Sequence, residues 1–169
     1  YSYEGVPDIR VIVFRGVPVM AMIRCATHSS DGKANLHQGA VGVGIDIGTG
    51  QSICAVQHNR IVRQHPDTHV YFDSLSIPHW QQVLELASGC AGMTGLDYLG
   101  VDIVLDRLRG PMLLELNARP GLAIQVANQA GLQHRLELAA KIADDFDKAD
   151  QKIAAARRYF TSVTAQNIL

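Results

Sequence analysis

The sequence predicts an α+β fold built on a largely antiparallel sheet with helices at its sides. Runs of apolar, β-branched residues come in pairs around short glycine-containing turns, which is typical of β-hairpins. Apolar residues at helical spacing occur only outside these pairs. Strands that come as hairpins, and not as strand–helix–strand units, favour antiparallel pairing. With 169 residues, of which 47% are hydrophobic, the chain can bury one core of ordinary size.

The first hairpin is predicted near the start of the sequence. Residues 8–14 (DIRVIVF) and 17–24 (VPVMAMIR) are apolar runs separated by Arg15 and Gly16. The next segment, residues 27–35 (THSSDGKAN), is rich in Ser, Asp, Gly and Asn, the residues that favour turns. We expect a polar loop there.

The middle of the sequence predicts two more strands and a helix. Residues 39–47 (GAVGVGIDI) are a glycine-rich strand, and glycines weaken a strand unless another part of the chain must approach closely. Residues 52–57 form a further strand, and residues 58–76 are irregular. From residue 80 to residue 91, apolar residues recur at helical spacing.

The last part predicts a second hairpin and terminal helices. Residues 98–105 and 112–116 are strands joined by the polar connection DRLRG. Beyond Gly131, apolar residues from 132 to 146 repeat every three or four positions, which indicates an amphipathic helix. The alanine-rich, charged residues after 144 favour a partly exposed helix.

Composition excludes several classes of function. A formal net charge of −1 gives no electrostatic basis for binding nucleic acid or an anionic membrane surface. No apolar run approaches the roughly 20 residues of a membrane span, and no signal peptide is evident. Cys25, Cys54 and Cys90 are too few for a disulfide framework and too far apart for a zinc motif. We expect plain buried or half-buried thiols and a cytoplasmic location.

Three oxygen-bearing side chains are predicted to converge in the second hairpin. Asp102 lies in its first strand, while Glu115 and Asn117, two positions apart, share one face of its second strand. Two carboxylates and one amide suit Mg²⁺, which prefers oxygen ligands and completes its shell with water and phosphate. Solvated carboxylates are the simpler alternative. The apolar neighbours of Asp102 and Glu115 argue against it, because a carboxylate in such surroundings is costly unless it is paired or coordinated.

Cations and amide donors form a second group. Arg10, Arg24, Lys33 and Asn35 could bind a triphosphate through charge-assisted hydrogen bonds, with Lys33 and Asn35 just before the glycine-rich strand. On residue type alone, a solvated lysine in a turn is the more usual interpretation of Lys33.

Other motifs carry less weight. His65 and His69 have a zinc-like spacing, but Pro66 disfavours the helix that such a pair needs. The segment GAVGVGIDIGTG contains no Walker A lysine and no GxGxxG before a helix, so neither nucleotide motif is present. His37 could orient the neighbouring loop or act near the substrate, but an ordinary hydrogen-bonded histidine is the favoured interpretation.

The motif GVDIVLD…GPMLLELNARPG resembles the closing metal-binding motif of the ATP-grasp superfamily. With PDIRVIV and DGKANLHQGA in the same order, the chain resembles RimK-type α-L-glutamate ligases and, more closely, the α-L-glutamate ligase-like or sugar-transfer-associated ATP-grasp proteins. The similarity runs from about residue 5 to about residue 136. It implies that the fold is the C-terminal subdomain of an ATP-grasp protein.

The resemblance also implies roles for individual residues. Asp102, Glu115 and Asn117 correspond to the metal ligands. Asp8 and the segment Lys33-Ala34-Asn35 correspond to residues that contact ATP, although the family has arginine at the position of Lys33. We also expect Arg10 to bind the nucleotide.

Two arginines extend these expectations. Arg24 corresponds to an arginine that contacts the phosphate or acyl phosphate, so we expect it to be catalytic. Arg119 replaces a small residue of the RimK-type enzymes, and it either binds an acidic substrate group or pairs with a surface carboxylate.

The reaction implied by the resemblance is ATP-dependent ligation of a carboxylate to an amine through an acyl phosphate. ATP and Mg²⁺ are the expected cofactors, with Mn²⁺ as an alternative metal, and the partners are small-molecule or peptide carboxylates and amines. A homo-oligomer is an open alternative. Two rival functions also stay open, namely a non-catalytic nucleotide- or partner-binding module and a ligase in cell-surface polysaccharide assembly.

We expect residues 1–143 to form the nucleotide- and metal-binding subdomain and residues 144–169 a C-terminal helical tail. ATP-grasp enzymes clamp ATP between two subdomains, and the first supplies two lysines to the phosphates. The only lysines here are Lys33, Lys141, Lys148 and Lys152. We therefore expect the N-terminal subdomain to be missing from this chain.

Overall fold

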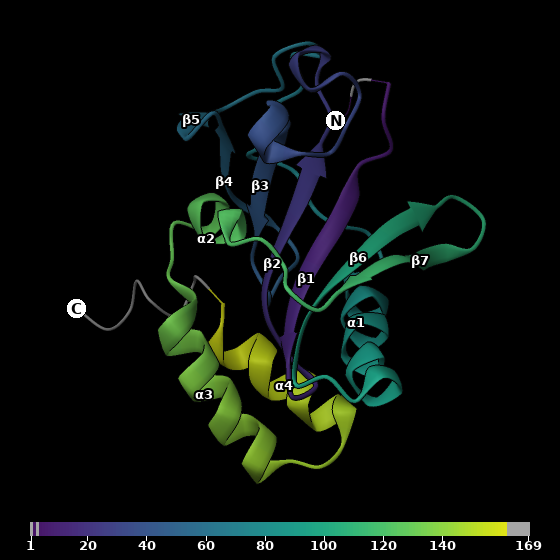
Figure 1. The fold of residues 1–169 in the computed structure, drawn as a ribbon, viewed down its shortest axis with the longest axis vertical. Coiled ribbons are helices and arrows are strands. Elements are labelled where there is room, and N and C mark those ends of the chain that lie inside the picture. Colours follow the sequence, from purple (N-terminus) through teal and green to yellow (C-terminus); the bar gives the residue numbers. More distant parts are fainter. Residues whose placement is uncertain (1, 3, 162–169) are drawn as a thin grey trace.

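A seven-stranded sheet lies at the centre of the molecule (Figure 1). The computed structural model describes residue 2 and residues 4–161. The strand order is β5-β4-β3-β2-β1-β6-β7, and every neighbouring pair is antiparallel. This confirms the predicted α+β class with an antiparallel sheet. The strands are β1 (Asp8–Phe14), β2 (Val17–Cys25), β3 (Val41–Ile45), β4 (Ser52–Gln57), β5 (Arg60–Val62), β6 (Tyr98–Asp106) and β7 (Gly110–Asn117).

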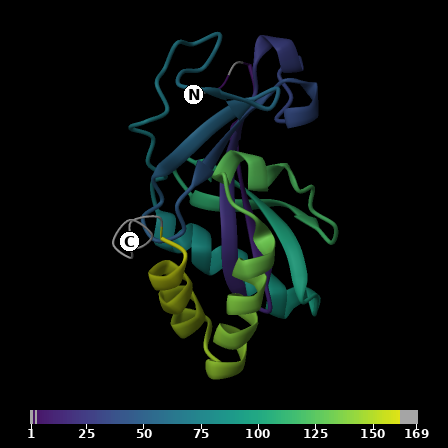
Figure 2. The same ribbon diagram turned by 90° about the vertical axis from the view of Figure 1, so that its left-hand side faces the viewer.

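Helices cover both faces of the sheet (Figures 1 and 2). Helix α2 crosses one face over β2, β3 and β4, while α1 packs on the opposite face against β1 and β6. Helices α3 and α4 pack against each other and against β2. The helices are α1 (Trp80–Thr94), α2 (Ala123–Asn128), α3 (Leu132–Asp145) and α4 (Ala149–Tyr159), with short 3₁₀ helices η1 (His28–Ser30) and η2 (Leu36–Gln38).

Most elements lie where the sequence predicts them, but strand β5, helix α2 and the short 3₁₀ helices η1 and η2 were not predicted. Strand β5 falls inside the segment expected to be irregular, and its three residues are too few to show alternation. Helix α2 has six residues, too short for a helical repeat to be evident. The predicted tail helix is present as α4, and the rest of the tail, residues 162–169, lies outside the described residues.

A β-bulge sets the register of the first hairpin. Phe14 pairs with Val17 and Val13 with Pro18, but the register shifts by one residue between Ile12 and Val13. Proline has no N–H for the ladder and is therefore tolerated at a bulge. As a result Asp8 pairs with Arg24, whereas an unbroken register would have placed it opposite the apolar Ile23.

A second β-bulge sets the register of the β6–β7 hairpin. Asp106 pairs with Gly110 and Ile103 with Leu113, and the register then shifts so that Asp102 pairs with Glu115. Without the shift, the partner of Asp102 would have been Leu114. The bulge thus puts two carboxylates on the same side of the hairpin, as the sequence predicts.

The glycines of β3 are positions of close approach, as predicted. A Cβ at Gly42 would lie 2.6 Å from Leu36 Cδ2, and one at Gly44 would collide with the carbonyl oxygen of Ala127 in α2. These two glycines therefore let η2 and α2 lie directly on the sheet.

The cysteines are plain thiols in the described part of the chain. Cys25 and Cys90 are buried and Cys54 is half-buried, as expected, and all three are free. Burial raises the pKa of the Cys25 thiol to about 12. Among the described residues, no helix combines the length and the apolar character needed to cross a bilayer.

Replacing Gly44 by alanine should destabilise the fold by about 1–3 kcal/mol, because the new methyl group has to push α2 away from the sheet. Gly92→Ala in α1 is the matched control. A Cβ there would have nothing within 4 Å, so the change should stabilise the protein by about 0.5–1 kcal/mol through helix propensity. Urea unfolding measures both. Equal effects of the two changes would contradict the close approach of α2.

Candidate functional site

Charged side chains from three neighbouring strands gather on one face of the sheet. Strand register pairs Asp8 with Arg24 and Arg10 with Asp102, and alternation puts all four side chains on the same side. We call this side of the sheet the site face. It is also the side on which α2 lies, because Gly44 pairs with Met22 and touches α2.

Asp102 is the centre of this group. Its side chain is only 1% exposed and accepts hydrogen bonds from two guanidinium groups. Arg10 Nε donates to Oδ1 at 2.7 Å and Arg10 Nη2 to Oδ2 at 2.6 Å, a two-pronged pair, while Arg24 Nη2 donates to Oδ2 at 2.8 Å. These bonds compensate a carboxylate that burial would otherwise destabilise.

Asp8 holds the other side of Arg24. Arg24 Nε donates to Asp8 Oδ1 at 2.7 Å, and Arg24 Nη2 bonds Asp8 Oδ2. Burial raises the pKa of the Asp8 carboxyl, an effect that the hydrogen bond and charge of Arg24 oppose. Burial tends to lower the pKa of Arg24, but its bonds to Asp8 and its charge interactions with both carboxylates outweigh this and raise it. Arg24 is thus a fixed, permanently charged bridge between two carboxylates.

Glu115 and Asn117 extend the group toward the edge of the sheet. Turned so that its nitrogen donates to Glu115 Oε1 (3.0 Å), the Asn117 amide presents its oxygen to Arg10 Nη2 at 3.3 Å. The prediction that the apolar neighbours enclose both carboxylates is correct for Asp102 but wrong for Glu115, which is exposed. The reason is that β7 is an edge strand, where Leu114 is also 59% exposed.

The predicted ATP loop lies beside this group but is not bonded into it. Lys33 is exposed, and its Nζ is 3.7 Å from Asp31 Oδ2. The Asn35 side chain accepts from the backbone N–H of His37 and so caps η2, and Ala34 is half-buried between them. Leu36 packs on Gly42, the residue that pairs with Arg24, so the loop is anchored next to Arg24.

The histidines do not form a metal site with one another. His65 is fully buried, its Nε2 is 2.9 Å from the carbonyl oxygen of Ala26, and its Nδ1 accepts from the backbone N–H groups of Asp67 and Thr68. Both ring nitrogens are therefore used. Within residues 2 and 4–161, no three His, Cys, Asp or Glu side chains cluster as a metal site.

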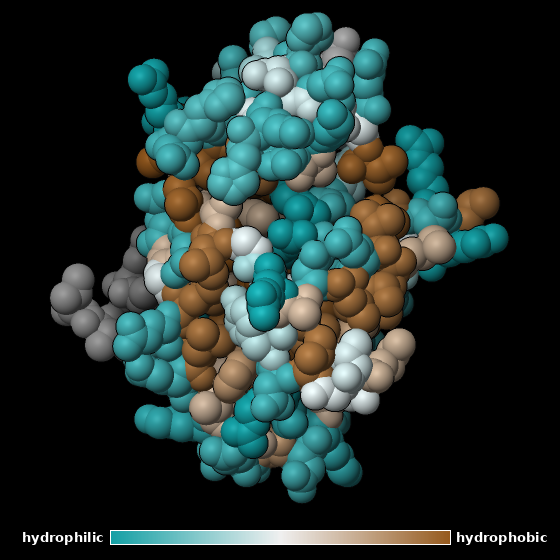
Figure 3. Space-filling model, in the orientation of Figure 1, coloured by the Kyte–Doolittle hydropathy of each residue, from teal (hydrophilic) through white to brown (hydrophobic). Residues whose placement is uncertain are grey.

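The arrangement on the site face combines two guanidinium groups with oxygen donors. Two guanidinium groups can bind an anion such as a phosphate, while Asp102, Glu115 and the Asn117 amide can bind a hard divalent cation. In Figure 3 the middle of this face is hydrophilic and hollowed, with hydrophobic surface to either side.

Comparison with known proteins decides the family. The sequence model of the sugar-transfer associated ATP-grasp family matches residues 1–141. The chain belongs to this family. This confirms the resemblance to the ATP-grasp superfamily, and the finer likeness to RimK-type ligases stays a hypothesis.

Solved structures of the ATP-grasp ligase PsnB are also similar to this chain. One contains a minimal precursor with Mg and ADP, and another contains the precursor peptide PsnA2 and AMPPNP. Sequence identity is 16–17% and the TM-scores are 0.42–0.43. This ATP-grasp chain is covered to 89–90% and spans about a third (32–34%) of the PsnB chain. No curated protein matches it.

Sequence reasoning treated the arginines and Asp102 as separate groups, and the structure of this ATP-grasp chain joins them. The register of the first hairpin could have indicated only that Asp8 pairs with Arg24, and the bulge at Pro18 obscures even that, because simple counting back from Arg15-Gly16 puts Ile23 opposite Asp8. The pairing of Arg10 with Asp102 depends on β1 lying beside β6, which the local sequence does not reveal.

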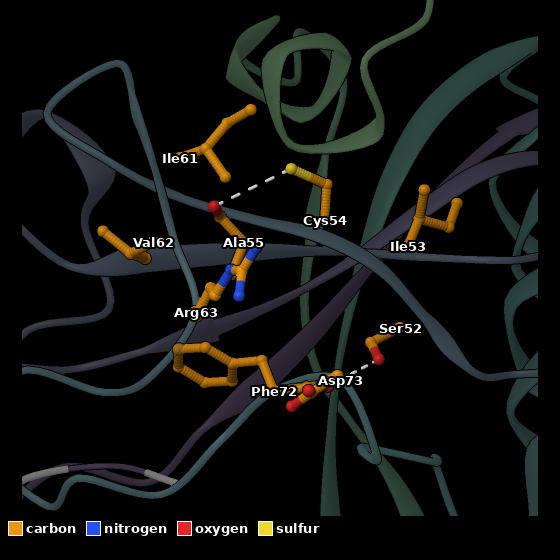
Figure 4. Close-up of a pocket in the computed structure, with 9 residues that line it drawn as sticks. All are labelled: Ser52, Ile53, Cys54, Ala55, Ile61, Val62, Arg63, Phe72 and Asp73. Atoms are coloured by element: carbon orange, nitrogen blue, oxygen red, sulfur yellow. Dashed lines mark hydrogen bonds between the residues drawn. The ribbon is translucent and has the colours of Figure 1, made fainter.

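A cavity of about 280 Å³ lies elsewhere, at the β4–β5 end of the sheet (Figure 4). Strand β3 separates it from β2 and its Arg24. Its wall is mixed apolar and polar, and it is lined by Ser52, Ile53, Cys54, Ala55, Ile61, Val62, Arg63, Phe72 and Asp73. It contributes none of the side chains of the site face.

Replacing Arg24 by methionine should cost roughly 3–5 kcal/mol of stability, because it leaves two buried carboxylates without their shared partner. Arg15→Met is the matched control. Its partner Asp144 is 64% exposed, and such surface pairs contribute at most about 1 kcal/mol. Urea unfolding at neutral pH distinguishes the two. A similar loss of stability in both variants would mean that the buried ion pairs of Arg24 contribute no more than the surface pair of Arg15.

Proposed function

We propose that this chain is the nucleotide- and metal-binding part of an ATP-dependent ligase that joins a carboxylate to an amine through an acyl phosphate. Membership of the ATP-grasp family makes ligase chemistry the natural class. The observation that carries the proposal is the grouping of two arginines with the Asp102, Glu115 and Asn117 side chains on the site face.

Asp102, Glu115 and Asn117 are the proposed ligands of Mg²⁺, with Mn²⁺ as an alternative. All are oxygen donors, Asp102 pairs directly with Glu115, and the Asn117 amide touches Glu115. Three protein ligands leave positions for water and phosphate oxygens, as Mg²⁺ requires. A metal ion held by these residues would neutralise negative charge on the phosphates.

Arg24 is the proposed catalytic residue. Its guanidinium can stabilise charge on the transferring phosphoryl group, and its bidentate bond to Asp8 fixes its direction. Asp8 therefore acts through Arg24 as a positioning residue. Arg10 is proposed to bind ATP phosphates, and Lys33, Ala34 and Asn35 to form a loop that closes over the nucleotide.

We propose small-molecule or peptide carboxylates and amines as substrates. The family description favours one variant, in which the ligase acts in cell-surface polysaccharide assembly, since it associates the family with sugar transfer. A non-catalytic nucleotide-binding module is the remaining candidate. A measured ATP-dependent ligase activity would distinguish both ligases from this non-catalytic module.

We also propose that turnover needs a second subdomain that supplies lysines to the phosphates. Lys33 is exposed in its loop beside Asp31, and Lys152 Nζ donates to the carbonyl oxygen of Arg15 at the far end of the β1–β2 hairpin. On this proposal, residues 1–143 form one of the two subdomains that enclose ATP. Residues 144–169 form its C-terminal helical tail.

In a protein that combines this chain with the proposed second subdomain, Asp102→Asn and Glu115→Gln should each abolish most of the activity, because each removes a proposed charged metal ligand. The assay is ADP release, screened over amino acids and acceptors. Glu85→Gln, on the exposed side of α1, is the control and should keep full activity. Unchanged ADP release by the Asp102 and Glu115 variants would refute the metal assignment.

The isolated 169-residue chain should bind ATP weakly and show no turnover, since neither Lys33 nor Lys152 is bonded into the group on the site face. Calorimetry with AMPPNP and an ADP-release assay measure the two properties. Robust ATP hydrolysis by the isolated chain would show that no second subdomain is needed.

A further inference from the structure

Arg10 occupies the point at which the proposed metal ligands converge. Its Nη2 lies 2.6 Å from Asp102 Oδ2 and, with the Asn117 amide turned so that both of its groups are satisfied, 3.3 Å from the oxygen of that amide. Two of the three proposed ligands thus direct oxygens at one guanidinium nitrogen. We infer that Arg10 is an internal cation that competes with the metal for this site, and that metal binding displaces it toward the nucleotide phosphates. This inference rests on the proposed function.

Asp102 cannot hold Arg10 and a metal ion in the same way at once. Arg10 spans both of its oxygens, and Arg24 takes a further position on Oδ2. The side chain is 1% exposed, so an ion cannot reach it without moving a donor. A Mg²⁺ ion needs its ligand oxygens at about 2.0–2.1 Å in a near-octahedral arrangement. The guanidinium of Arg10 fills that space.

Arg10 is the donor that can leave, and Arg24 is the one that stays. Arg24 is held by Asp8 as well as by Asp102, so losing one bond leaves it anchored. Among the described residues, Asp102 is the only carboxylate to which Arg10 is hydrogen-bonded.

The exchange would free a cation next to the nucleotide. Without ligands, the two buried carboxylates of Asp8 and Asp102 are matched in number by Arg10 and Arg24. When a metal ion takes the oxygens of Asp102 and Asn117, the positive charge of Arg10 is released next to the anionic nucleotide. Metal and nucleotide binding should therefore assist each other, and the metal alone should bind weakly because it must first displace a charge-assisted pair.

The test is Mn²⁺ binding to the 169-residue chain in the absence of nucleotide, measured by electron paramagnetic resonance. Arg10→Gln should bind Mn²⁺ at least about tenfold more tightly than wild type, the factor expected for removing one charged hydrogen-bonded competitor. Arg10→Lys, which keeps the charge but loses the two-pronged geometry, should fall between them. Arg15→Gln, whose partner Asp144 lies in α3 at the other end of β1, should match wild type.

A second measurement follows Arg10 in the unaltered chain. Its side-chain Nε–H resonance should be protected from exchange in the free protein and should lose that protection as Mg²⁺ is added, while the Nε–H of Arg24 stays protected. A protected Arg10 Nε–H at saturating metal would overturn the inference even if the Arg10 variants fold poorly.

The Asp102→Asn variant distinguishes a failure of the proposed competition from a failure of the proposed metal site. If Arg10→Gln binds Mn²⁺ no better than wild type and Asp102→Asn abolishes binding, the metal site stands and the competition is refuted. If Asp102→Asn leaves binding unchanged, or neither wild type nor Arg10→Gln binds Mn²⁺, the proposed metal site itself is refuted.

Discussion

The buried carboxylate of Asp102 is the constraint on which the site face depends. A charge that is only 1% exposed, in a strand flanked by apolar residues, is tolerated only when donors surround it. Arg10 and Arg24 supply those donors from β1 and β2, and Asp8 in turn fixes Arg24. In the structure without ligands, the four residues therefore form one connected polar network with Asp102 and Arg24 at its centre.

Two β-bulges make this unit possible. Each shifts a hairpin by one residue, and in an antiparallel pair a one-residue shift moves a side chain from one face to the other. The first puts Asp8 opposite Arg24, and the second puts Glu115 opposite Asp102. The site thus combines a rigid, buried half on the central strands with an exposed half on the edge strand β7. Such a combination suits a ligand that arrives from solvent and is then held by fixed charges.

The sequence predicts most residues of the site face, but it assigns the metal ligands and the arginines to two separate groups. Asp102, Glu115 and Asn117 were expected to converge from hairpin spacing alone, and the register confirms that they do. The arginines were assigned to a separate phosphate group, because nothing in the local sequence reveals that β1 lies between β2 and β6. Strand order is a long-range property, and the pairing of Arg10 with Asp102 joins residues 92 positions apart.

The sequence by itself determined the antiparallel α+β fold, the two hairpins, the need for close approach at Gly42 and Gly44, and the residue types of the candidate site. These follow from local rules of alternation, turn chemistry and backbone freedom. Only the tertiary structure decided that Asp102 is buried while Glu115 is exposed, and that Arg10 stands among the proposed metal ligands. The reason is physical. Burial and charge pairing depend on which strands are central and which are edges, and those positions are set by packing of the whole chain.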